Sequence, residues 1–241
     1  MRLLAPALAC ALVSCLDFST EGKHFRCERP GGCDAGTAPD AGSGSDAGSA
    51  SDAGPAWVPL KADVVDPGDE LGWVVALSRD GNTIAAAALR EASAGANPSD
   101  NSAPSAGAVY IFSRSGGPWS MRARLKASNP GANDLFGSSL SLSATGDVLA
   151  VGAPREAGSG TGANPAARDN GKPGSGAVYV FHRSLQDSWS EVDYLKGCQS
   201  DPNDEFGAAV ALSRDGTMLA VGAPGEDGVF GDPASNDAGQ S

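Results

Sequence analysis

Two acidic stretches of the chain hold the residues best suited to chemistry. Their carboxylates are Asp66, Asp69, Glu70, Asp201, Asp204 and Glu205. Carboxylate oxygens are hard ligands, and about six to eight oxygens bind a Ca²⁺ ion. The matching stretch between them supplies only Asp134, and nothing in the sequence makes these side chains converge. Acidic, solvated turns are therefore the favoured interpretation, and a calcium site is the weaker alternative.

The rest of the sequence shows no catalytic constellation. The two histidines, His24 and His182, have no acid or base partner at a recognisable spacing. The Gly-x-Ser-x-Gly motif of serine hydrolases does not occur, and the glycine-rich stretches lack the strand, lysine and helix that bind phosphate groups. We therefore expect a protein that is not an enzyme.

Residues 1–14, MRLLAPALACALVS, predict an export signal. A single Arg2 precedes an apolar run that is too short to span a bilayer but has the length of a signal-peptide core. The Leu-Val-Ser-Cys sequence that follows resembles the bacterial lipobox, which implies acylation of Cys15. A cleaved signal peptide in which Cys15 is incidental is the alternative. We expect an exported lipoprotein of a bacterial outer membrane or cell surface, attached to the membrane by its lipid anchor alone.

The remaining cysteines differ in their expected roles. Cys27 and Cys33 enclose a Pro-Gly-Gly turn in a chain expected to reach an oxidising compartment, so residues 15–33 are expected to contain a small local disulfide. Two cysteines alone make a weak metal site. Cys198 has two open interpretations: a small buried hydrophobe, or one half of a disulfide to a part of the protein that this sequence lacks.

Residues 34–56 form a low-complexity linker. The triplet Asp-Ala-Gly begins at four positions in this segment, which are Asp34, Asp40, Asp46 and Asp52. The segment has almost no apolar side chain to bury, so folding cannot offset its loss of chain entropy. We expect a flexible tether and not a calcium-binding repeat, because no strand-forming residues lie between the carboxylates.

The composition argues against nucleic acid as a partner. The formal net charge is -12, from 29 acidic and 17 basic residues, so a phosphate backbone would be repelled. The chain has 33 Gly and 16 Pro with only 6% aromatic residues, which argues against a leucine-rich helical core.

A repeat begins after the linker. Three segments align without gaps, starting LKADV at Leu60, LKASN at Leu125 and LKGCQ at Leu195. A second block, GAVYIFSR from Gly107 and GAVYVFHR from Gly176, lies between them. The resulting units span residues 57–118, 119–188 and 189–241.

Each unit predicts four short antiparallel strands, because apolar residues alternate or run in stretches bounded by turn formers. The Asp80-Gly81 and Asp215-Gly216 pairs predict tight hairpins. Four strands per repeat of this length predict blades of a β-propeller, an all-β fold. The chain holds about 2.7 such units, fewer than the roughly four to eight that close a propeller. We therefore expect an incomplete propeller, with further blades beyond Ser241.

A long polar insert separates the second and third strands of each unit, for example residues 155–175. Such inserts emerge on one face of a propeller, and loops on a rigid scaffold are common binding sites. Trp119 and Trp189 recur at the same place in the repeat, which favours packing within the blades over sugar stacking.

Two short motifs recur in the second and third units. Phe136-Gly137 and Phe206-Gly207 are each followed by Gly-Ala-Pro, at residues 152–154 and 222–224. This pairing resembles the FG-GAP repeats that build the integrin α-subunit propeller and many bacterial surface proteins. The resemblance extends from Trp57 to the end of the chain. The first unit departs from it and indicates a degenerate terminal blade, with substitutions at Leu71-Gly72 and Ala85–Ala88.

The resemblance also implies a calcium loop, whose pattern this sequence has lost. Many FG-GAP hairpins hold Ca²⁺ through an Asp-x-Asn-x-Asp-Gly-x-x-Asp loop. In the third unit Asp215 and Ser213 match the inner positions, but the outer positions fall on Ala211 and Leu219. In the other units the outer positions fall on Ala76, Ile84, Ser141 and Leu149. Aliphatic side chains offer no oxygen, so we expect no calcium in these hairpins and no other cofactor.

The sequence supports two functions of different classes. The first is a non-catalytic cell-surface binding or adhesion scaffold, whose partner is a protein or a carbohydrate. The second is a targeting or accessory propeller domain of a secreted enzyme whose catalytic part is not in this chain. No motif in the sequence identifies the ligand.

Overall fold

The computed structural model describes residues 59–62, 66–166 and 169–227. The lipidation site Cys15, the Cys27–Cys33 pair, His24 and the linker at residues 34–56 lie outside the described residues, and the predictions made for them stay predictions. Within the described ranges, no helix is long and apolar enough to cross a membrane.

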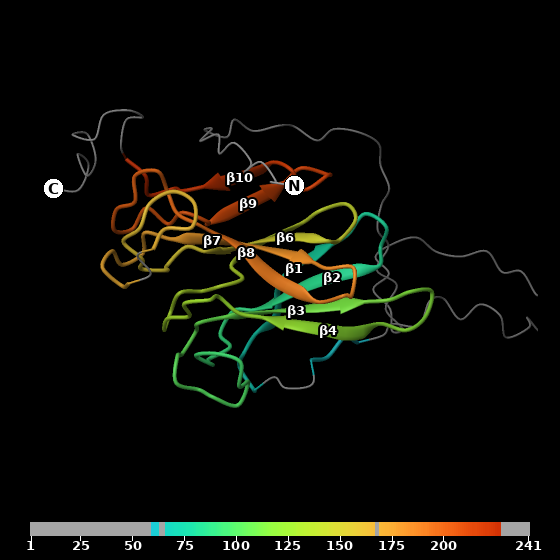
Figure 1. Cartoon of the computed structure of the whole chain (residues 1–241). Coiled ribbons are helices and arrows are strands. Elements are labelled where there is room, and N and C mark those ends of the chain that lie inside the picture. Colours follow the sequence, from blue (N-terminus) through green and yellow to red (C-terminus); the bar gives the residue numbers. More distant parts are fainter. Residues whose placement is uncertain (1–58, 63–65, 167–168, 228–241) are drawn as a thin grey trace, which may run out of the picture. The chain divides into compact units, whose positions relative to one another are not determined.

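The described secondary structure consists of β-strands in three antiparallel sheets (Figure 1). Sheet 1 contains β1 (Leu71–Leu77), β2 (Thr83–Ala88), β3 (Ala108–Ser113) and β4 (Ser120–Leu125). Sheet 2 contains β5 (Ser139–Leu142), β6 (Val148–Ala153), β7 (Ala177–Arg183) and β8 (Trp189–Leu195). Sheet 3 contains β9 (Ala209–Leu212) and β10 (Leu219–Gly222). The strands of sheets 1 and 2 pair in chain order, which confirms the predicted all-β fold of four-stranded blades.

The sheets are offset by one strand from the repeat units of the sequence. The strands that begin next to Trp119 and at Trp189 are β4 and β8, and they form the last strands of sheets 1 and 2. A unit that starts at either tryptophan therefore combines the last strand of one sheet with the first strands of the next. Because of this offset, each repeat boundary is bridged by hydrogen bonds between strands.

Glycine makes the predicted hairpins possible. Gly81, Gly146 and Gly216 have φ values of 69°, 69° and 70°, in the left-handed region that glycine adopts without steric cost. The three turns also bond to one another, because Arg79 N donates to Ala144 O at 3.1 Å and Ala144 N donates to Arg214 O at 2.9 Å. Equivalent turns of successive blades are thus joined in a row.

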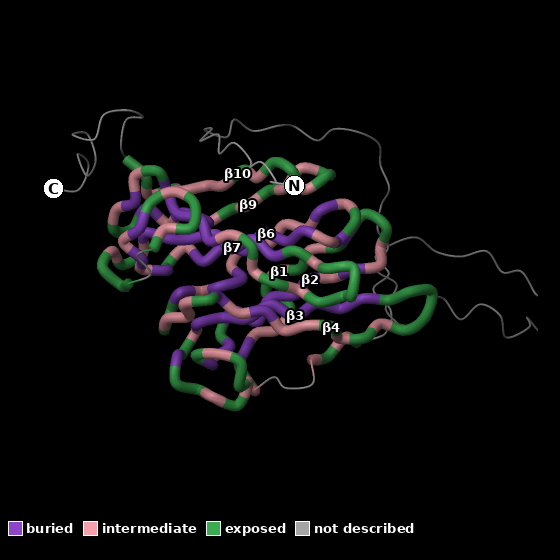
Figure 2. Tube along the Cα trace, viewed as in Figure 1, coloured by how far each residue is buried: buried purple, intermediate pink, exposed green. Residues whose placement is uncertain are grey.

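Successive sheets pack face to face through alternating side chains, as strand geometry requires. In sheet 2, Val151 and Tyr179 face a core shared with sheet 1, while Ala150 and Val178 face a core shared with sheet 3. All four are buried, so the middle sheet is covered on both sides (Figure 2). Both tryptophans pack against apolar cores as predicted, Trp189 between sheets 1 and 2 and Trp119 beside Phe112.

The Phe-Gly and Gly-Ala-Pro motifs lie where neighbouring sheets approach each other. Phe136 is fully buried and meets Tyr179 edge-on, with ring centroids 5.3 Å apart. A Cβ on Gly152, in the Gly-Ala-Pro motif of sheet 2, would lie 2.0 Å from the carbonyl oxygen of Gly207, in the Phe-Gly motif of sheet 3. The two glycine positions therefore allow a backbone approach that a side chain would prevent.

One prediction within the described region needs correction. Cys198 is exposed, so its interpretation as a small buried hydrophobe is wrong. Its segment connects β8 to β9 at the surface, where the backbone of a connecting loop can be solvated.

Candidate functional site

The long inserts and the connections between sheets lie at one end of the strands, and the short hairpins lie at the other. The inserts join β2 to β3 and β6 to β7, and they are on the left of Figure 1. Each insert is bonded to the Phe-Gly turn of the next sheet: Asn133 N donates to Pro104 O at 2.8 Å, and Asn203 N donates to Pro173 O at 3.0 Å. We call this end the loop face, and its parts are held by backbone hydrogen bonds on a rigid scaffold.

One aspartate in each acidic stretch caps its own turn. Asp69, Asp134 and Asp204 each accept a bond from the backbone N–H three residues earlier, at 2.8, 2.6 and 2.6 Å. All three are buried. Burial raises the pKa of Asp69, and it raises the pKa of Asp134 and of Asp204 to about 6. These carboxylates therefore stabilise turns. Asp134 stands in the same position as the other two, which its isolation in the sequence did not indicate.

Three of the other acidic candidates have separate partners, and the fourth, Glu205, lines a cleft described below. Glu70 pairs with Arg90 at 3.0 Å, Asp201 pairs with Lys172 at 2.9 Å, and Asp66 accepts a bond from Asn101 Nδ2 at 3.2 Å. Within residues 59–62, 66–166 and 169–227, no three metal-ligating side chains of His, Cys, Asp or Glu gather at one point. The calcium alternative therefore gains no geometric support from the described chain.

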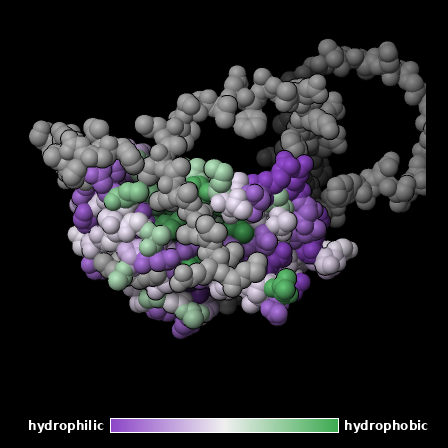
Figure 3. Space-filling model, turned by 45° about the horizontal axis from the view of Figure 1, so that its top comes forward, coloured by the Kyte–Doolittle hydropathy of each residue, from purple (hydrophilic) through white to green (hydrophobic). Residues whose placement is uncertain are grey.

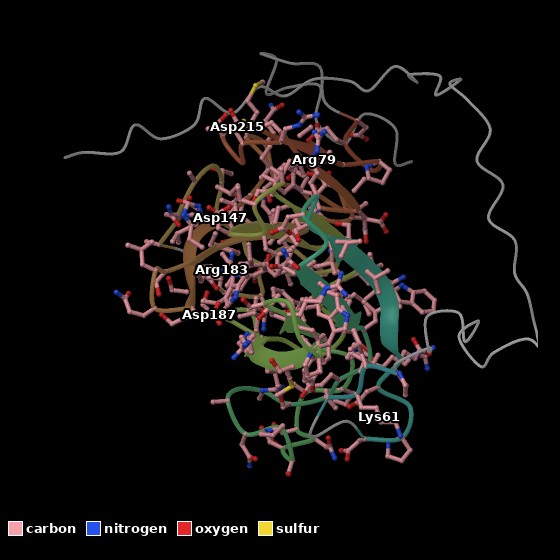
Figure 4. The ribbon with its side chains drawn as sticks, turned by 90° about the vertical axis from the view of Figure 1, so that its right-hand side faces the viewer. Lys61, Arg79, Asp147, Arg183, Asp187 and Asp215 are labelled. Carbon is pink, nitrogen blue, oxygen red and sulfur yellow. The ribbon has the colours of Figure 1, made fainter. Side chains whose placement is uncertain are left out.

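The hairpin carboxylates at the opposite end are bonded inside their own turns. Asp80 accepts bonds from Ser78 Oγ at 2.5 Å and from Asn82 N at 3.0 Å. Asp215 accepts bonds from Ser213 Oγ at 2.6 Å and from Thr217 Oγ1 at 2.8 Å, and these bonds lower its pKa to about 2. Figure 4 looks onto this end, where Arg79, Asp147, Arg183, Asp187 and Asp215 are labelled. Hydroxyl and backbone donors thus bond one oxygen of each of these carboxylates inside its own turn.

A buried ion pair fixes the start of the insert in sheet 2. Lys196 Nζ lies 2.6 Å from Glu156 Oε2, and Tyr194 Oη donates to Glu156 Oε1 at 2.9 Å. Sheet 1 repeats the pair, with Lys126 Nζ 2.7 Å from Glu91 Oε2. Burial lowers the pKa of Lys126 and of Lys196. These pairs were not predicted from the sequence, although the recurring Leu-Lys and the glutamate after each second strand were visible signals.

A polar cleft of about 530 Å³ opens on the loop face between the turns of sheets 2 and 3. Its lining includes Arg155, which directly precedes the buried Glu156, and the side chains of Asn133, Asn170, Asn203 and Glu205. The arginine and the three asparagines are exposed. Their side chains make no hydrogen bond or ion pair with any other residue that the structure describes. The cleft therefore offers a guanidinium, three amides and a carboxylate to a ligand.

His182 lies away from this cleft, at the end of β7, where it is exposed. A second hollow of about 510 Å³ lies over sheet 1 and has a mainly apolar lining that includes Ala94, Pro98 and Met121. Arg124 is part of its lining, but its guanidinium donates hydrogen bonds to Glu91 and Ser93. This hollow offers fewer free polar groups than the cleft between the turns.

The stacked four-stranded sheets and their joined turns define a repeat protein of the propeller class. The family model of the FG-GAP repeat matches residues 119–181 and 189–240. These two stretches of the chain are therefore similar to FG-GAP repeats. The matched stretches begin at Trp119 and Trp189, and the degenerate first unit lies outside them. A search of curated proteins finds no match to the chain.

Proposed function

We propose that this protein is a non-catalytic binding or adhesion scaffold of the cell surface, which holds a protein or carbohydrate partner on its loop face. The observation that carries the proposal is the polar cleft between the Phe-Gly turns of sheets 2 and 3. Its walls come from two consecutive turns and one insert, so the cleft exists only because the blades repeat. Loops held on such a scaffold are the usual binding surfaces of this architecture.

The chemistry of the cleft suits a ligand rich in hydroxyl or amide groups. Each asparagine offers two donors and one acceptor, and the Arg155 guanidinium adds five donors. Glu205 adds a negatively charged carboxylate, whose two oxygens accept hydrogen bonds. Such mixed lining matches the hydrogen-bonding surface of a glycan or of a peptide backbone better than that of an apolar molecule.

Export and lipid anchoring would place the loop face outside the cell. The apolar run before Cys15, the lipobox-like sequence and the linker at residues 34–56 support this part of the proposal. A flexible linker of that composition would hold the blades away from the membrane. The partner would then lie in the medium or on a neighbouring surface.

The test compares the full chain with Arg155→Ala/Asn203→Ala on an array of extracellular glycans and on a panel of immobilised extracellular matrix proteins. We expect saturable binding of the wild type to at least one probe and a loss of at least about tenfold in the double variant, since two hydrogen-bonding groups are removed. Arg79→Ala is the matched control, because Arg79 is also exposed but lies at the hairpin end. Equal binding by wild type and double variant would reject the cleft as the site.

A further inference from the structure

Sheet 1 contains an ion pair that sheet 2 does not repeat. Oε1 of Glu70, in the turn before β1, lies 3.0 Å from Nε of Arg90, which follows β2. The same two positions of the repeat hold Leu135 and Arg155 in sheet 2. Glu70 and Leu135 share one backbone conformation, with φ values of 59° and 57°. Arg155 therefore lacks a counter-charge because a leucine stands where sheet 1 has a glutamate.

Sheet 3 keeps the other half of this pair. Glu205 has the conformation of Glu70, with a φ value of 56°, and the arginine position holds Gly225. Gly225 N donates to Asp204 O at 3.1 Å, which matches the bond that Arg90 N makes in sheet 1, also at 3.1 Å. The backbone of the pair is therefore present in sheet 3, but a glycine stands where sheet 1 has the cation.

The two unmatched charges line the same cleft. Arg155, after β6, and Glu205, before β9, both contribute to the polar cleft of about 530 Å³. Neither side chain makes an ion pair or a hydrogen bond with another residue of the described ranges. An arginine without a counter-charge attracts an anion, and its planar guanidinium can bind a carboxylate through two parallel hydrogen bonds. The cleft thus offers a ligand the contact that Glu70 makes with Arg90.

We propose that Arg155 makes the cleft specific for an acidic glycan, because it binds a carboxylate of one sugar as Arg90 binds Glu70. This inference rests on the proposed function and names the ligand class of the same cleft. Glu205 would repel a second negative charge in the ligand, and the net charge of -12 disfavours any polyanion. The glycan that fits therefore carries one carboxylate at this point, as a hexuronate does next to a neutral sugar.

The lining of the cleft favours a glycan over a protein as the source of this carboxylate. Among the described residues that line it, the apolar side chains are the small ones of Ala132, Ala157 and Pro173. Protein partners bind mainly through aromatic and other large side chains in well-packed pockets, which these residues do not form. The three exposed asparagines of the cleft offer donors and acceptors that match sugar hydroxyls. Figure 3 shows mainly hydrophilic and intermediate residues at its left, the end where the inserts lie in Figure 1.

The test titrates the full chain with two disaccharides that differ in one group. The first joins a hexuronate to a neutral hexose, and the second is the carboxyl-reduced form of the first. Isothermal titration calorimetry should show binding of the acidic form that is at least about tenfold tighter, because the bond to Arg155 is charge-assisted. Arg155→Gln should bind the two forms equally. Arg90→Gln is the matched control and should keep the preference, because Arg90 holds the same repeat position but is already paired with Glu70.

A second variant occupies Arg155 from within the chain. Leu135→Glu introduces a carboxylate where Glu70 and Glu205 have one, with the same backbone conformation. The new ion pair with Arg155 should remove the preference for the acidic disaccharide. Leu135→Gln is the control and should keep the preference, because it replaces the same side chain without adding a charge. Circular dichroism would establish that every variant is folded, and a folded Leu135→Glu variant with the wild-type preference would contradict the role of Arg155.

The wild type itself gives the decisive results. Equal binding of the two disaccharides, or binding of neither, would overturn the inference. The proposed function would survive either result if the wild type still bound a matrix protein or a neutral glycan, and it would fail as well if no probe were bound. A capped tripeptide with one central aspartate is the last probe. Tighter binding of this peptide than of the acidic disaccharide would assign the carboxylate to a protein partner, and the acidic glycan would then be the wrong ligand.

Discussion

The Nζ atom of Lys196 lies 2.6 Å from Oε2 of Glu156, with side chains 0% and 1% exposed. The lysine directly follows the last strand of sheet 2, and the glutamate lies at the start of the insert that lines the candidate cleft. Ser175 Oγ, at the end of the same insert, also accepts a bond from Lys196 at 2.7 Å. One buried ammonium thus ties both ends of this insert to the scaffold.

Removal of one partner from this ion pair should destabilise the fold strongly. Lys196→Met leaves the Glu156 carboxylate buried without its counter-charge, a situation that costs about 3–5 kcal/mol of unfolding free energy. Urea unfolding followed by circular dichroism measures the loss. Lys172→Met is the control, because the Lys172–Asp201 pair is partly exposed and should contribute less than about 1 kcal/mol. A smaller loss for Lys196→Met than for the control would contradict the structural role.

A companion variant separates charge from packing. Lys196→Met/Glu156→Gln removes both charges and keeps an acceptor oxygen for Tyr194. We expect it to be more stable than Lys196→Met alone, because no uncompensated charge stays buried. Equal stability of the single and double variants would show that the loss comes from packing.

The capping aspartates should make the protein less stable as the pH rises from about 4 to about 7. The folded-state pKa of Asp134 and of Asp204 is about 6, above the ordinary aspartate value of 3.8. Between pH 3.8 and about 6 the folded state therefore binds more protons than the unfolded state. The resulting stabilisation of the folded state is fully present below the unfolded pKa and is lost as the pH rises through about 6. Asp134→Asn/Asp204→Asn should reduce this slope in unfolding experiments, because asparagine still accepts the turn bond but does not titrate.

Asp215 provides a contrast of opposite sign. Hydrogen bonds from Ser213 and Thr217 lower the pKa of Asp215 to about 2. Its contribution to the stability of the folded state is therefore present above the unfolded-state pKa and is lost as the pH falls toward 2. Asp215→Asn should therefore change the stability difference from wild type below pH 4 but not between pH 5 and 7. An effect confined to the higher range would contradict the assignment.

Gly152 should tolerate no side chain. A Cβ at this position would lie 2.0 Å from Gly207 O and 2.2 Å from Ser139 Oγ, so the junction between sheets 2 and 3 must shift. We expect Gly152→Ala to cost about 1–3 kcal/mol in urea unfolding. Gly117→Ala is the matched control, since a Cβ there meets nothing within 4 Å. Similar stability of the two variants would mean that the junction adapts without strain.

Calcium should leave the thermal stability of the full chain unchanged. The carboxylates of Asp80 and Asp215 already accept bonds from their own turns, and the outer ligand positions are occupied by Ala211 and Leu219 or their equivalents. Differential scanning calorimetry with and without millimolar Ca²⁺ measures the effect, with Mg²⁺ as the control ion. A rise in Tm that Asp80→Asn/Asp215→Asn abolishes would show that these hairpins bind calcium.

The sequence by itself determined the strands and their order. The signals are local: apolar residues alternate, and turn pairs such as Asp80-Gly81 separate the strands. Each signal recurs in successive repeats, as the spacing between Gly137 and Gly207 shows. The same local reasoning predicts no calcium in the hairpins, because ligand positions in a short turn depend on adjacent residues.

Only the tertiary structure decided which side chains meet across blades. Glu156 and Lys196 are far apart in sequence, and the cleft between Asn133 and Asn203 joins turns of different sheets. Nothing local to either residue encodes such a distance, because it follows from how the strands pair within a sheet and from how one sheet packs on the next. The exposure of Val75 and Leu77 is of the same kind: their residue types match those of the buried junctions, and the packing of the sheets decides that they face solvent.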